Sequence, residues 1–197
     1  ADNNTGIGYA ALNQNTTGTS NTALGSQALD ANTTANNNTA IGFRALTLST
    51  TGQSNSALGV NALGSTTTGR NNVAVGLASL YTNTTGRDNT AVGLDALAYN
   101  TTGEDNTALG YGAGDNITTG SNNTVIGNAA DASSATVDNE ITLGDSNIAT
   151  LRCNVQTISS LSDARDKTNV IDLPEGLDFI TKLRPVKFEW ATRDGNG

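Results

Sequence analysis

The chain has 197 residues and a net charge of −8, with 22 glycines, many asparagines and threonines, one cysteine and no histidine. An acidic chain without runs of basic residues argues against nucleic-acid binding, and no run of 18 apolar residues is present to span a membrane. Without histidine, a metal-ligand cluster or a glycine-rich phosphate loop, the sequence gives little support to an enzyme with an external substrate, and we expect no cofactor and no metal.

A 17-residue repeat fills the first part of the chain, residues 1–146. Its consensus is N-T-A-Φ-G-x-x-A-L-x-x-N-T-T-G-x-x, where Φ is aliphatic. The period has no insertions, so each copy is predicted to be one structural unit stacked on the one before it. The copies begin at Asn4, Asn21, Asn38, Asn55, Asn72, Asn89, Asn106, Asn123 and Glu140.

Each copy is predicted to form one coil of β-structure. Asn, Thr and Gly disfavour helix interiors. The segments T-A-Φ-G and x-A-L are strand candidates, and N-T-T-G is typical of a turn, because Asn can bond its own backbone and Gly can adopt a positive φ. The predicted fold class is therefore all-β: a parallel β-roll or β-solenoid of nine coils, stacked at about 4.8 Å per coil.

The register places like residues in columns. The predicted core consists of a Φ column and a leucine column, which are Ile7, Leu24, Ile41, Leu58, Val75, Val92, Leu109, Ile126 and Leu143, and Leu12, Leu29, Leu46, Leu63, Leu80 and Leu97. The column of first asparagines, Asn4 to Asn123, is predicted to stack as a structural amide ladder rather than to bind a ligand.

A column of alanines predicts assembly. Its small residues, followed by Gly two places on, should let another backbone approach closely; they are Ala23, Ala40, Ala57, Ala74, Ala91 and Ala108. The conformational entropy lost when a coil becomes ordered costs more free energy than the burial of two aliphatic side chains contributes. We therefore expect this face to pack against further copies in a parallel homotrimer.

The repeats also resemble a known family. "NTAIGFRAL" and "NTAVGLDAL", within residues 4–144, are similar to the head repeats of trimeric autotransporter adhesins, which form a left-handed parallel β-roll. They are more similar to the repeats that precede the chaperone domain of bacteriophage tail fibres. The resemblance implies the adhesive shaft of a virion tail fibre or tailspike, with a host cell-surface glycan or protein as receptor. A bacterial trimeric adhesin on the cell surface is the alternative.

An ice-binding solenoid is a further alternative. Threonine pairs such as Thr16–Thr17 and Thr101–Thr102 recur in columns. An ice-binding face needs two threonines that point the same way, at alternate positions of a strand. Here the threonines are adjacent and lie in a turn, which argues against this function.

The sequence changes after the repeats. Residues 147–161 are predicted to be an extended linker, intertwined about the trimer axis, in which Cys153 is a small buried hydrophobe. Residues 162–197 are predicted to begin a small α+β domain, with a helix over about 175–183 and a strand at 185–190.

Two motifs in residues 162–197 resemble the opening of the S74-type intramolecular chaperone domain of phage endosialidases and tail fibres: "SDARDK" at 162–167, and "LRPVKFEW". Those domains trimerise, assist folding of the fibre and release themselves by cutting before the Ser. The resemblance implies that Ser162 is the nucleophile, that Lys167 is its general base and that the bond between Leu161 and Ser162 is cut in the intact parent protein. We expect residues 162–197 to be a truncated form of that domain.

The implied chemistry has a physical requirement. A lysine amine acts as a base only if burial lowers its pKa from about 10.4, and trimer assembly could supply that burial. The alternative is that Ser162 is a turn or helix-cap residue, followed by a solvated charge cluster at 163–167.

Overall fold

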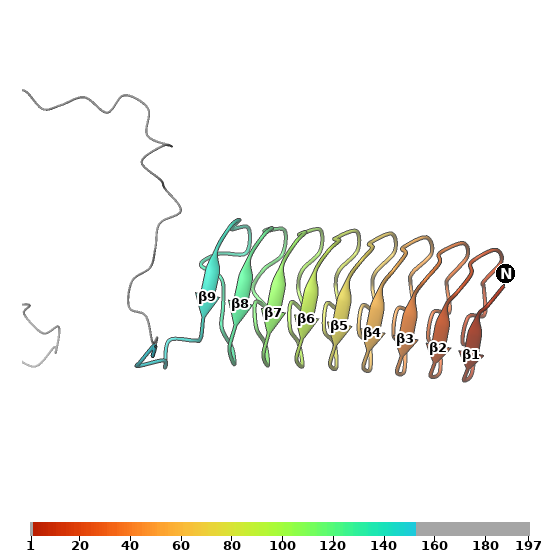
Figure 1. Cartoon of the computed structure of the whole chain (residues 1–197), viewed down its shortest axis with the longest axis horizontal. Helices are drawn as coiled ribbons and strands as arrows, with labels where there is room; N and C mark the ends of the chain where they lie inside the picture. Colours follow the sequence, from red (N-terminus) through yellow and green to blue (C-terminus); the bar gives the residue numbers. More distant parts are fainter. Residues whose placement is uncertain (1, 153–197) are drawn as a thin grey trace, which may run out of the picture. The chain divides into compact units, whose positions relative to one another are not determined.

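A computed structural model of the chain describes residues 2–152. These residues form a parallel β-solenoid with one three-residue strand per coil and no helix (Figure 1). The strands make a single sheet in chain order, β1 (Thr5–Ile7), β2 (Thr22–Leu24), β3 (Thr39–Ile41), β4 (Ser56–Leu58), β5 (Val73–Val75), β6 (Thr90–Val92), β7 (Thr107–Leu109), β8 (Thr124–Ile126) and β9 (Ile141–Leu143). The predicted fold class is confirmed for this part of the chain.

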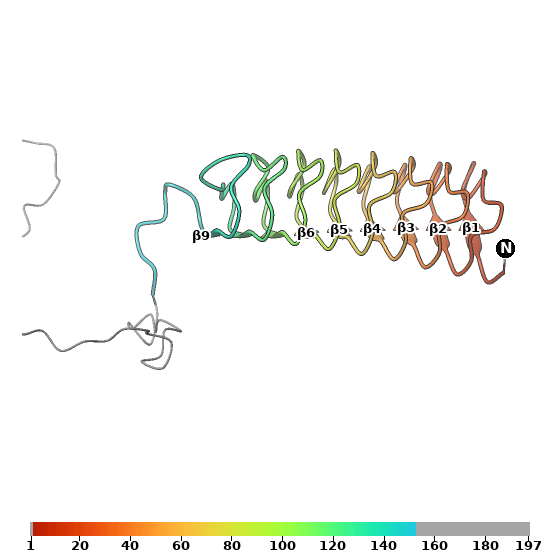
Figure 2. The same cartoon turned by 90° about the horizontal axis from the view of Figure 1, so that it is seen from above.

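The strand register keeps every repeat position in line. In the pairing of β2 with β3, Thr22 lies opposite Thr39, and Ala23 lies opposite Ala40. The same 17-residue offset holds at all eight pairings. Seen from above, the coils follow one another with a similar outline along the repeats (Figure 2). Like residues therefore stack in columns, as the period predicted.

The core lies inside each coil, between the strand and the segment that returns behind it. The predicted leucine column is confirmed, because its members from the second coil on are fully buried; they are Leu29, Leu46, Leu63, Leu80 and Leu97. Leu12, in the first coil, is half-buried and packs against the same cluster. The middle residue of each strand from β2 to β8, such as Ala23 or Ala57, is buried in the same cluster as these leucines.

The Φ column is not part of this core, and that prediction was wrong. Leu24, Leu58 and Leu109 are 45%, 48% and 49% exposed. Successive side chains of a strand point to opposite faces, so the central Ala points inward while the flanking Thr and Φ residues point outward. The prediction that the Ala column faces a partner chain was wrong for the same reason, because these alanines fill the interior of their own coil.

The second predicted strand, x-A-L, is also absent from the described coils. Gln27 and Leu29 have φ angles of 60° and 50°, and the equivalent residues of other coils repeat these values. A positive φ is uncommon in a non-glycine residue. Hydrogen bonds to the neighbouring coils hold this conformation: the Gln27 N–H donates to the Tyr9 carbonyl at 2.7 Å, and the Leu29 N–H donates to the Ala45 carbonyl at 3.0 Å.

A glycine column forms the tight bend after each strand. Gly8 has a φ of 134°, and a Cβ placed on it would lie 2.5 Å from the carbonyl oxygen of Gly25 in the next coil. Both the backbone angle and the close stacking of coils therefore require glycine. The column comprises Gly8, Gly25, Gly42, Gly59, Gly76, Gly93, Gly110 and Gly127.

Of the predicted linker at 147–161, only residues 147–152 are described; they form no strand and are exposed. The predicted helix at 175–183, the strand at 185–190 and Cys153 lie outside the described residues.

Candidate functional surfaces

The asparagine at the start of each repeat is structural, as predicted. Asn55 accepts the Asn72 backbone N–H on its Oδ1 at 3.0 Å and donates its Nδ2 to the Gly69 carbonyl at 2.9 Å. Both polar groups of the amide are therefore used inside the chain, which leaves none for a ligand. The same pattern recurs along the buried column Asn21, Asn38, Asn55, Asn72, Asn89, Asn106 and Asn123.

A second asparagine ladder, in the N-T-T-G segment, was not predicted. Asn83 donates its Nδ2 to the Gly86 carbonyl at 3.1 Å, and Asn100 donates to the Oδ1 of Asn83 at 3.0 Å. The Oδ1 of Asn100 is buried without a hydrogen-bond partner. The reason is that Ile117 occupies the equivalent place in the next coil, where an asparagine would donate. The recurrence of Asn at 15, 32, 83 and 100 was the sequence signal for this ladder.

The predicted threonine columns are present on the surface. Thr33 donates its hydroxyl to the Thr50 carbonyl at 3.1 Å, and Thr84 donates to the Thr101 carbonyl at 3.0 Å. These bonds join each coil to the next, so the first threonine of each pair contributes to stacking of the coils.

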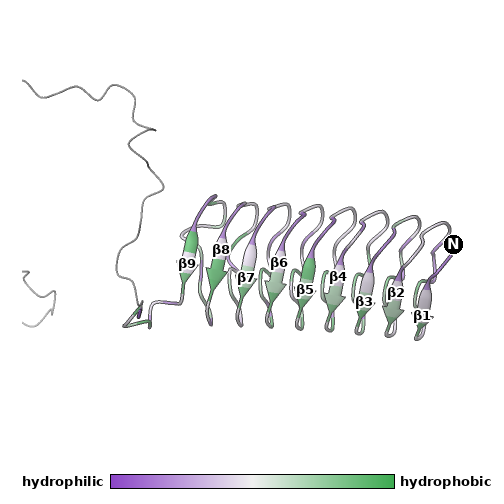
Figure 3. Cartoon of the chain, viewed as in Figure 1, coloured by the Kyte–Doolittle hydropathy of each residue, from purple (hydrophilic) through white to green (hydrophobic). Residues whose placement is uncertain are grey.

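The strands carry the main apolar surface of the described residues. It combines the outward Φ side chains with the large side chains that follow the glycine bend, and Figure 3 shows hydrophobic colour on the strands, strongest on β5, β8 and β9. Many exposed apolar side chains on one set of strands and bends mark a site of interaction. We call this surface the apolar face; its exposed members are Ile7, Leu24, Leu58, Leu109, Ile126 and Leu143, with Tyr9, Phe43, Val60, Leu77, Leu94 and Tyr111.

Charged side chains lie on the surface of the coils. Arg87 forms an ion pair with Glu104 in the next coil at 2.7 Å. The hydrogen bond to Glu104, together with its charge, raises the pKa of Arg87. Partial burial raises the pKa of Asp115, and the nearby carboxylate of Asp131 raises it further.

Within residues 2–152, no group of three or more acidic or thiol side chains is arranged to hold a metal ion. No helix in that part of the chain is long and apolar enough to cross a membrane. The carboxylates Asp95 and Glu104 are half-buried, and Glu104 pairs with Arg87.

The implied catalytic residues, Ser162 and Lys167, and the implied cut after Leu161 lie outside the described residues. Their roles stay predictions.

Comparison with protein families bears on the end of the chain. Residues 162–197 match the Peptidase_S74 family, described as the chaperone of endosialidase. The match begins at Ser162, where the "SDARDK" motif begins. No curated protein and no solved structure is significantly similar to the chain. The chain thus combines a β-solenoid with a segment of the S74 chaperone type.

Proposed function

We propose that the chain is the shaft of a bacteriophage tail fibre or tailspike, a homotrimeric rod that attaches the virion to a glycan or protein on the host surface. The observation that carries this proposal is the regular solenoid followed, in one chain, by the match to the S74 chaperone family. A chaperone segment of this type implies that the protein joined to it needs help to fold and assemble. The adjoining solenoid has an exposed apolar surface that is suited to assembly.

The apolar face supports association with further copies of the same chain. It offers one outward Φ side chain per coil, so its pattern repeats every 17 residues along nine coils. A partner that covers it must carry apolar groups at the same spacing of about 4.8 Å. A second copy in parallel register has that spacing. The expected interface is thus the strand face, and the number of copies, three, follows from the S74 resemblance.

Native mass spectrometry of the full chain tests this assembly. We expect a trimer for the wild type and monomers for the double variant Leu58→Lys and Leu109→Lys, because two charges per chain would be buried without partners. Leu48→Lys is the matched control: Leu48 is 50% exposed but lies outside the apolar face, and this variant should remain a trimer. Circular dichroism verifies that each variant is folded. A monomeric wild type, or a double variant that stays trimeric, would contradict the proposed interface.

We also propose that the intact protein cuts itself before Ser162. The Ser162 hydroxyl attacks the Leu161 carbonyl carbon, Lys167 accepts the hydroxyl proton, and the peptide bond is replaced by an ester to Ser162 Oγ. The proton passes to the released amino group of Ser162, and water hydrolyses the ester. The products are a shaft that ends in a Leu161 carboxylate and a released chaperone with its serine restored.

Intact-mass measurement of the full-length protein tests the cut. The wild type should yield chains that end at Leu161, whereas Ser162→Ala should remain uncut. Ser160→Ala is the matched control and should be cut normally. If the wild type stays whole while it assembles, the S74 segment acts in folding alone.

A further inference from the structure

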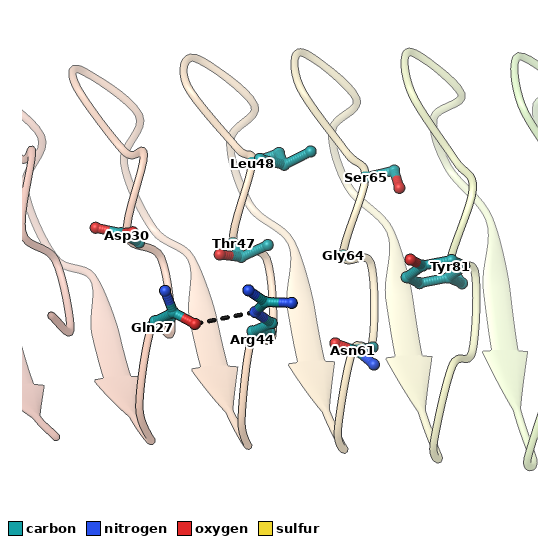
Figure 4. A pocket seen from close by; sticks show the side chains of 9 residues that line it. All are labelled: Gln27, Asp30, Arg44, Thr47, Leu48, Asn61, Gly64, Ser65 and Tyr81. Atoms are coloured by element: carbon teal, nitrogen blue, oxygen red, sulfur yellow. Dashed lines mark hydrogen bonds between the residues drawn. The ribbon is translucent and has the colours of Figure 1, made fainter. Parts of the chain in front are cut away.

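A recess opens on the returning segments of the solenoid, and it borders the apolar face at Phe43. Its volume is about 330 Å³, and it spans coils two to five (Figure 4). Its walls come from the returning segments, whereas the strands lie behind them in this view. The buried leucines of the core, such as Leu46 and Leu63, lie inside the coils that carry the recess.

The recess results from a glycine beside a tyrosine. Gly64 and Tyr81 each follow the core leucine of their coil, in successive coils. Gly64 does not have a positive φ, so its backbone does not require glycine. A Cβ on Gly64 would lie 3.2 Å from both Cδ2 and Cε2 of Tyr81. The missing side chain thus makes room for the Tyr81 ring, which is 43% exposed and forms one wall.

Polar side chains form the opposite wall. Arg44 donates its Nε to the Oε1 of Gln27 at 2.9 Å, and its guanidinium carbon lies 5.3 Å from the centre of the Phe43 ring. These contacts hold the guanidinium in place. Its two terminal nitrogens have no hydrogen-bond or ion-pair partner within residues 2–152.

Two further polar groups of the recess are unused within residues 2–152. The Oδ1 of Asp30, at the edge of the recess, is buried and accepts no hydrogen bond. The side-chain amide of Asn61, between the two walls, also makes no hydrogen bond in that part of the chain. The Asn61 amide offers both a donor and an acceptor to a molecule bound in the recess.

We propose that the recess binds a neutral saccharide unit. The apolar face of a sugar ring would lie on Tyr81, and its hydroxyl groups would accept from Arg44 and Asn61 and donate to Asn61. Hydroxyl groups both donate and accept, which fits a site that offers donors and acceptors together. The volume lies at the lower end of the roughly 300–1,000 Å³ typical of small-molecule sites, and Arg44 and Tyr81 are two coils, or about 10 Å, apart. The site deepens the proposed function by giving the attachment shaft a receptor chemistry, and it rests on that proposal for its biological meaning.

Saturation-transfer NMR on the full chain tests the site, with the methyl glycosides of glucose, galactose, mannose and N-acetylglucosamine as probes. We expect transfer to the ring protons of at least one probe. Tyr81→Ala should weaken its binding about tenfold, because it removes the stacking surface. Gly64→Val should have a similar effect, because its side chain would displace the Tyr81 ring. Tyr99→Ala is the matched control, because Tyr99 is an exposed tyrosine that does not line the recess, and it should bind as the wild type does.

Failure of this site and failure of the proposed function can be told apart. Absence of transfer from all four probes, or an equal loss in Tyr99→Ala, overturns the saccharide site; if the protein is nevertheless a trimer, the shaft proposal stands. Transfer that depends on Tyr81 in a monomeric protein supports the site and overturns the trimeric shaft.

Discussion

The backbone N–H of Asn72 donates to the Oδ1 of Asn55 at 3.0 Å, and both residues are fully buried. Asn72 in turn donates its Nδ2 to the Gly86 carbonyl at 2.9 Å and accepts the Asn89 N–H at 3.1 Å. Asn72→Ala would leave that carbonyl and that N–H buried without these partners. We expect a loss of about 2–4 kcal/mol in the free energy of unfolding, measured by urea denaturation. Asn13→Ala, at an exposed asparagine, should change it by less than about 0.5 kcal/mol. Equal effects would contradict the structural role of the ladder.

The leucine column should carry much of the stability of the coils. Leu63 is fully buried, and truncation to alanine leaves a cavity between its strand and the returning segment. We expect Leu63→Ala to lower the free energy of unfolding by about 2–5 kcal/mol. Leu48→Ala, at a leucine that is half exposed, is the control and should cost less than about 0.5 kcal/mol. A small effect at Leu63 would show that the core lies elsewhere.

Two glycines of the first part of the chain should respond to alanine in opposite ways. Gly59 has a φ of 145°, and a Cβ there would meet the Gly76 carbonyl oxygen, so Gly59→Ala should cost at least about 2 kcal/mol. Gly6 occupies the place that Ala23 has in the next coil. A Cβ on Gly6 would make ordinary contacts at 3.4 Å and 3.6 Å, so Gly6→Ala should be neutral or stabilise by up to about 1 kcal/mol. Thermal unfolding of both variants compares the two effects, and destabilisation by Gly6→Ala would contradict the packing of the first coil.

Asp115 should make stability depend on pH. Partial burial, followed by the carboxylate of Asp131 and then that of Asp95, raises the pKa of Asp115 in the folded protein. The folded state therefore favours the protonated acid, so the contribution of this group to stability is present at low pH and is lost as the pH rises through its folded pKa. Asp115→Asn removes the charge. We expect the variant to be more stable than the wild type at pH 7, with a difference that disappears below about pH 4. A difference that grows as the pH falls would reverse the assigned sign.

The number of coils, the leucine column and the first asparagine ladder could be predicted because each depends only on the period. The direction of the strand side chains could not. Ala57 and Leu58 are both apolar and both recur every 17 residues, so the pattern alone does not say which one points inward. Volume decides: the space behind the strand already holds Leu63, and only a small residue fits beside it.

The turns of the returning segment were missed for a different reason. The positive φ of Leu29 is held by a hydrogen bond to Ala45 in the next coil, and local propensity does not reveal such a contact. A signal was nevertheless present. No Val, Ile or Thr occurs at the positions equivalent to Gln27 and Leu29 in the first seven coils, and β-branched residues strongly disfavour positive φ.

The recess was hidden from the linear sequence, because Arg44, Gly64 and Tyr81 meet only when coils are aligned side by side. The roles of Ser162 and Lys167 rest on the motif and on the family match, and they await the cleavage experiment.

The bonds between coils also determine how this part of the chain would respond to force. Each coil is joined to its neighbours by bonds such as those from Leu29 to Ala45 and from Asn38 to Asn21. Tension applied to the two ends of the solenoid would load these bonds one coil at a time, starting from a terminal coil. Each coil that peels away releases 17 residues, which extend by about 55 Å. A tether built in this way would lengthen in equal increments and dissipate work at every step, while the remaining coils stay intact.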